Sequence, residues 1–143
     1  MRRGNPRCGK ANELRLCEQW TAGAKSVFQF DVQGSVAKST HAGLPWLMWL
    51  RQHPQGGQRV HCWPFDGFEV PPGKVVFAEI YPAMFKRRFP RDGRSPDEQD
   101  AFAVAAWLQG MDRRGALPRY FSPPLSLPEK RQAQLEGWIL GVW

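Results

Sequence analysis

The sequence contains no long hydrophobic run, since no segment approaches the ~18 apolar residues that a membrane-spanning helix needs. The basic start of the chain is not followed by the apolar stretch of a secretory signal. The three cysteines, Cys8, Cys17 and Cys62, show no metal-ligand spacing, and an odd number fits a reducing compartment. We therefore expect a cytoplasmic protein that does not act at a membrane.

Several kinds of catalytic or metal-binding residues are also scarce. The three histidines, His41, His53 and His61, lack ligand spacing, so a zinc site is not expected. Ser35 is not part of a Gly-x-Ser-x-Gly motif, which argues against a serine hydrolase. Acidic residues are fewer than basic ones, 13 against 20, and the net charge is +7. This excess favours an anionic partner such as nucleic acid, although it also serves solubility alone.

What the chain does have is enough apolar sequence for a folded core. Hydrophobic residues make up 42%, and there are seven tryptophans. We predict a flexible basic lead over residues 1–10 and a single α/β domain over residues 11–143. The domain is organised around a strand at 75–81, whose apolar run predicts a central strand of a parallel or mixed sheet, covered on both faces.

Other elements are predicted from periodicity and from capping residues. Each helix is placed by a cap, by an early proline or by an apolar face, and each strand by β-branched or alternating residues. The predicted elements are a helix at 12–21 capped by Asn12, a strand at 26–32, a turn at 33–35, a well-covered helix at 44–53 with Pro45 in its first turn, a strand at 59–63, a helix from Ser95 to Leu108 ended by Gly110, a helix at 126–135, and an apolar tail at 136–143 that packs onto the body.

Three carboxylates form the candidate catalytic site. Glu79 stands near the end of the central strand, and Asp97 and Asp100 have the i, i+3 spacing that places them on one helix face. Oxygen ligands of this kind suit Mg²⁺ or Mn²⁺ in phosphodiester cleavage. The simpler alternatives are that Asp97 complements the helix dipole and that Glu79 forms an ion pair.

A run of basic residues lies between these acids in the sequence. The run 86–94 carries five positive charges and one negative charge. It could contact the phosphate backbone of a nucleic acid, or it could be an ordinary solvated face. The candidate substrate-binding residues are Lys86, Arg87, Arg88, Arg91 and Arg94.

Seven short motifs occur in an order that resembles the C-terminal half of an uncharacterised bacterial family of predicted RNase H-like nucleases. They are Lys25-Ser-Val-Phe-Gln29, Gly34-Ser-Val36, Gly43-Leu-Pro45, Trp63-Pro-Phe65, Glu79-Ile-Tyr-Pro82, Asp97-x-x-Asp100-Ala and Glu136-Gly-Trp-Ile-Leu-Gly141. The resemblance implies an incomplete RNase H-like α/β fold, in which a mixed sheet of about three strands is flanked by helices. It also implies that Asp97 and Asp100 are the metal ligands of a late helix. Ala83 stands where related members have another acid.

The family's first strand would precede residue 15, and the sequence there does not supply it. We therefore expect a fragment or a trimmed relative with part of its site missing, and an exposed sheet edge that favours self-association or a partner chain unless something covers it. Three functions stay open: a metal-dependent nuclease, a non-catalytic module that binds nucleic acid or protein through 86–94, and a small-substrate phosphoester or nucleotide hydrolase.

Overall fold

The computed structural model describes residues 10, 12–29, 37–53 and 59–143. The chain divides into two compact units, Met1–Arg59 and Val60–Trp143, and each is described by itself. The described part of unit 1 contains the short helix α1 (Leu16–Trp20) and the longer helix α2 (Ala37–Gln52). Unit 2 contains all the described strands and the candidate site residues.

Helix α1 is shorter than the predicted helix, and its N-cap is Arg15 instead of Asn12. The carboxylate of Glu18 explains this start, because it accepts hydrogen bonds from the backbone N–H and from Nε of Arg15, each at 2.9 Å. The strand predicted at 26–32 is wrong in its described part, where residues 26–29 form a turn. Ser26 causes the turn, since its Oγ accepts from the N–H of Phe28 and its carbonyl accepts from the N–H of Gln29. The rest of that strand and the turn at 33–35 lie outside the described residues.

Helix α2 begins well before the predicted position, so Pro45 lies inside the helix and not in its first turn. The prediction that this helix is well covered is also wrong. Trp46 is 73% exposed, and Leu44, Met48 and Trp49 are exposed as well. The other helix in the described part of unit 1 is α1, which has five residues and is too short to cover four turns of apolar side chains.

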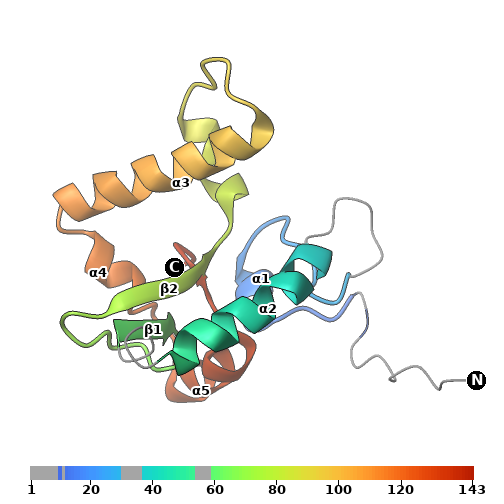
Figure 1. Ribbon diagram of the computed structural model, residues 1–143, viewed down its shortest axis with the longest axis vertical. Coiled ribbons are helices and arrows are strands. Elements are labelled where there is room, and N and C mark those ends of the chain that lie inside the picture. Colours follow the sequence, from blue (N-terminus) through green and yellow to red (C-terminus); the bar gives the residue numbers. More distant parts are fainter. Residues whose placement is uncertain (1–9, 11, 30–36, 54–58) are drawn as a thin grey trace, which may run out of the picture. The chain divides into compact units, whose positions relative to one another are not determined.

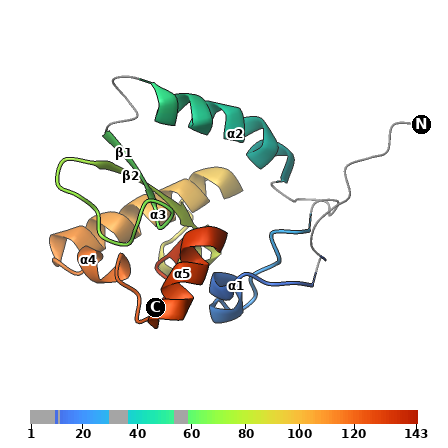
Figure 2. The same cartoon turned by 90° about the horizontal axis from the view of Figure 1, so that it is seen from below.

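Unit 2 is built on three parallel strands in the order β1-β2-β3: β1 (Val60–Trp63), β2 (Val75–Ile80) and β3 (Ile139–Leu140). The strands predicted at 59–63 and 75–81 and the central position of β2 are confirmed. The third described strand, β3, lies in the tail and not at 26–32. Both described pairings are parallel, with Val60 opposite Val75 and Glu79 opposite Ile139, so the described sheet is not mixed. Figures 1 and 2 show β1 and β2 side by side. One prediction about β2 is wrong: it is not covered on both faces, because Val75, Phe77 and Glu79 are exposed.

The helices of unit 2 follow the capping signals in the sequence. Helix α3 (Pro96–Arg113) begins after Ser95, and α5 (Leu127–Glu136) begins after Ser126, each with a capping box as predicted. Gly110 does not end α3, which continues to Arg113. The connection between these helices contains the short helix α4 (Leu117–Tyr120).

The core of unit 2 is rich in tryptophan. Trp63 is buried between the edges of Phe68 and Phe121, with ring centroids 5.7 and 5.5 Å apart. Trp138 is fully buried and donates from Nε1 to the carbonyl of Val142 at 3.3 Å. Ile139 and Leu140 are buried too, which confirms that the apolar tail packs onto the body as strand β3.

Candidate functional site

The basic residues 86–94, called the basic segment below, connect the end of β2 to the start of α3 (Figure 1). Two 3₁₀ turns begin the connection, η2 (Pro82–Met84) and η3 (Lys86–Arg88). Phe85 lies between these turns, is 2% exposed and stacks on Trp107 of α3 with ring centroids 4.3 Å apart. Phe85, the residue directly before the basic segment, therefore anchors the start of the segment in the core of unit 2.

Gln99 of α3 holds the middle of the basic segment. This side chain is buried, and its Nε2 donates to the carbonyl oxygens of Lys86 at 3.2 Å and of Phe89 at 3.0 Å. The ring of Phe89 meets the ring of Phe102 edge to face at 5.9 Å. Two backbone carbonyls and one aromatic ring of the segment are thus fixed to the first turns of one helix.

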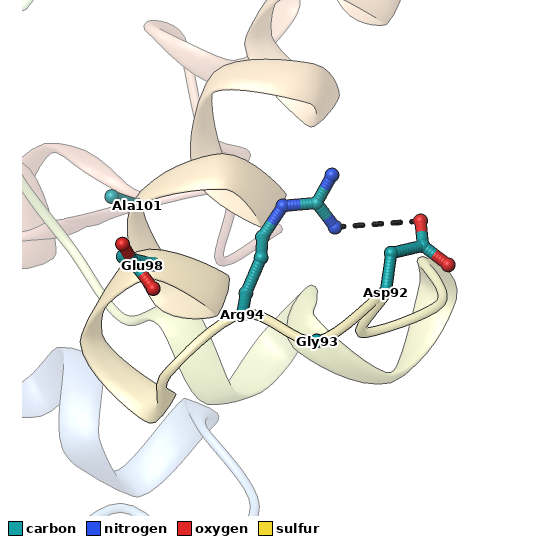
Figure 3. Close-up of a pocket in the computed structure, with 5 residues that line it drawn as sticks. All are labelled: Asp92, Gly93, Arg94, Glu98 and Ala101. Carbon is teal, nitrogen blue, oxygen red and sulfur yellow. Dashed lines mark ion pairs between the residues drawn. The ribbon is translucent and has the colours of Figure 1, made fainter.

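Arg94 closes the far end of the basic segment. Its guanidinium lies 3.6 Å from the ring centroid of Phe102, and its Nη1 donates to the carbonyls of Pro90 at 3.1 Å and of Arg91 at 3.2 Å. Figure 3 shows this guanidinium directed toward the carboxylate of Asp92, with 3.6 Å between Nη1 and Oδ2. These contacts assign Arg94 to holding the segment together.

A shallow, open hollow lies beside Arg94, and Glu98 of α3 lines it (Figure 3). The pKa of Glu98 is lowered, first by the hydrogen bond that the backbone N–H of Ser95 donates at 2.8 Å, then by the Ser95 side chain, and less by nearby Arg94. Glu98 is thus an ionised cap of α3 and is not suited to act as a general acid at neutral pH.

The remaining cations of the segment face outward. Lys86, Arg87, Arg88 and Arg91 are all exposed. Lys86 Nζ lies 3.8 Å from a carboxylate oxygen of Asp100. Among the described residues, no carboxylate forms an ion pair with Arg87, Arg88 or Arg91. The backbone of the segment is therefore fixed, and the three arginines on it are exposed. Two of them also contact the protein: Nε of Arg91 donates to the carbonyl oxygen of Arg94 at 2.5 Å, and Cζ of Arg88 lies 5.6 Å from the ring centroid of Phe85.

The three candidate metal ligands do not form a compact group. Glu79 is exposed on β2, Asp97 is exposed in the first turn of α3, and Asp100 is half-buried and paired with Lys86. Within residues 10, 12–29, 37–53 and 59–143, no three side chains of the types His, Cys, Asp and Glu lie close enough together to hold a metal ion. The described residues do not fit a two-metal centre.

Two residues that shape this site were not predicted from the sequence. Gln99 and Phe102 hold the basic segment, yet an isolated glutamine and phenylalanine in a helix carry no motif. The available signal was indirect: Gln99 lies four residues before Ala103 and eight before Trp107, so these three share the face of α3 that is buried. A polar residue on a buried helix face needs a partner, which here is the backbone of the segment.

Comparison with known proteins does not assign the chain to a family. No protein-family model matches the sequence, and neither a curated protein nor a solved structure matches it. The RNase H-like expectation consequently stays a prediction. Across the residues that the structure describes, none of the helices has the length and apolar character that crossing a bilayer requires.

Proposed function

We propose that this protein binds nucleic acid through the basic segment, without a catalytic step at that surface. The observation that carries the proposal is the fixed backbone of residues 86–94, which carries the exposed side chains of Arg87, Arg88 and Arg91. One guanidinium group can donate two parallel hydrogen bonds to the oxygens of one phosphate. Contacts with backbone phosphates supply most of the affinity of a nucleic acid for a basic protein.

The order of the segment matters for affinity. A flexible loop loses conformational entropy when it binds, whereas a segment that is already fixed loses less. Gln99, Phe85 and Phe102 make this contribution before any ligand arrives. The overall charge of +7 acts in the same direction, because it accelerates the encounter with a polyanion.

The metal-dependent nuclease is the second candidate, and its support is the motif resemblance together with the position of Asp97 and Asp100 beside the basic segment. Carboxylates so placed could bind Mg²⁺ or Mn²⁺ if further ligands joined them. Because the described residues supply no third ligand, we derive no cleavage step.

Fluorescence anisotropy with labelled single-stranded and duplex oligonucleotides tests the first proposal, in EDTA and over a range of salt concentrations. We expect binding that needs no divalent ion and weakens steeply with salt. In the variant Arg87→Ala/Arg91→Ala, the slope of log K against log salt should fall by about 2, roughly one for each lost phosphate contact.

The matched control is Arg113→Ala/Arg131→Ala, which removes the same charge from exposed positions on α3 and α5. Equal losses in the two double variants would show that only net charge matters and would refute a defined interface. Cleavage of the oligonucleotide that requires Mn²⁺ and disappears in Asp100→Asn would instead favour the nuclease.

A further inference from the structure

Strand β1 lies at one side of the described sheet, next to β2 and with no other described strand beside it. The outer side of such a strand normally offers N–H and C=O groups that can pair with a strand from another molecule. In a parallel strand, the N–H and the C=O of one residue both point toward the same neighbouring strand, and those of the next residue point the opposite way. Only every second residue of β1 therefore directs its backbone groups away from β2. Cys62 is one of the outward-facing residues, because its N–H and its carbonyl both bond to Asp66, and by alternation Val60 is the other.

The backbone N–H and C=O of Cys62 already form hydrogen bonds within the chain. The N–H of Cys62 donates to the carboxylate of Asp66 at 2.8 Å, and the carbonyl of Cys62 accepts from the N–H of Asp66, also at 2.8 Å. The loop that carries Asp66 is held in place, since a ring nitrogen of buried His61 lies 3.0 Å from the carbonyl oxygen of Gly67. Asp66 thus pairs with Cys62 as a neighbouring strand would.

We infer that Asp66 closes the free edge of β1 and prevents a second copy of this chain from adding a strand there. Its side chain accepts from the N–H of Cys62, and its backbone N–H donates to the carbonyl of Cys62. A second strand would have to displace both hydrogen bonds before it formed its own. The inference is independent of nucleic-acid binding, because the basic segment takes no part in it.

Sedimentation velocity of the full chain over a wide concentration range tests this inference with Asp66→Ala and Asp66→Asn. Asparagine keeps a side-chain oxygen that can accept from Cys62, so it is the matched control. We expect the mass of the alanine variant to rise with concentration from 16.4 kDa toward about twice that value, while the asparagine variant behaves like the unchanged protein. Near-UV circular dichroism of buried Trp63 and Trp138 reports whether each variant is folded.

Hydrogen exchange of the Cys62 amide in the unchanged protein provides a test that does not depend on the folding of any variant. Protection of this amide supports the closed edge, and exchange as fast as an exposed amide overturns it. A folded alanine variant with the same mass as the unchanged protein also overturns the inference. Association of both variants to the same extent would show that charge, and not the hydrogen bond, separates the copies, and would overturn it too.

Discussion

Gly141 tests how tightly the end of the chain packs against the segment that leads into the candidate site. Its φ is +101°, and a Cβ atom there would lie 2.8 Å from Cζ of Phe85 and 3.3 Å from Cη2 of Trp107. The two rings are buried and stacked, so neither can move away freely. Positive φ in a residue other than glycine costs about 1–3 kcal/mol, and overpacking a core costs about 1–3 kcal/mol. Gly141→Ala should therefore lower the free energy of unfolding by about 2–6 kcal/mol.

Urea unfolding followed by tryptophan fluorescence measures this loss. The matched control is Gly73→Ala, because Gly73 also has positive φ, +78°, but nothing lies within 4 Å of the position that a Cβ atom would occupy there. The control should lose only the conformational term, about 1–2 kcal/mol. Equal losses in the two variants would refute the close packing of Gly141 against the stacked pair of Phe85 and Trp107.

Two further predictions concern helices α3 and α5. Gln99→Leu removes the side-chain donor that bonds to the carbonyls of Lys86 and Phe89, so the free energy of unfolding should fall by about 1–3 kcal/mol and oligonucleotide binding should weaken. The control Gln109→Leu, at an exposed position of α3, should change neither quantity. The pKa of Glu129 is lowered from 4.5, first by the Ser126 hydroxyl and then by the Ser126 backbone N–H, so its stabilising effect is present above its unfolded pKa and is lost as pH falls through the lower folded value. Denaturant unfolding at several pH values should show Glu129→Gln to be destabilising near neutral pH and almost without effect once the pH is below the lowered folded pKa of Glu129, and a constant difference would contradict this assignment.

The parts of the fold that the sequence predicted well are those that depend on local signals. A proline stands one residue after Ser95 and two residues after Ser126, and a glutamate stands three residues after each serine, so the information for both helix starts lies within four residues. Strand β2 was also predicted, because a run of β-branched and aromatic residues favours an extended backbone on its own.

The errors arose where an alternative local interaction competed with the pattern. Residues 26–32 alternate as a strand does, but Ser26 bonds to the backbone two and three residues ahead and makes a turn. Helix α3 continues beyond Gly110 to Arg113. A glycine inside a helix lowers its stability by only about 1 kcal/mol relative to alanine, which is too little to end α3. Helix α2 has an apolar composition that predicts burial, but composition does not specify which residues would cover it.

The candidate site shows the same division between composition and arrangement. Charge was visible in the sequence at 86–94, but which cations reach solvent depends on contacts between residues far apart along the chain. Arg94 was expected to bind phosphate with the others, yet Phe102 and two carbonyls of its own loop engage it. Asp100 was expected to bind a metal, yet the segment folds back and places Lys86 beside it. Lys86 and Asp100 thus form an ion pair with each other, and their binding of phosphate and metal stays a prediction. The three arginines that no described carboxylate neutralises are accordingly the residues on which binding should depend.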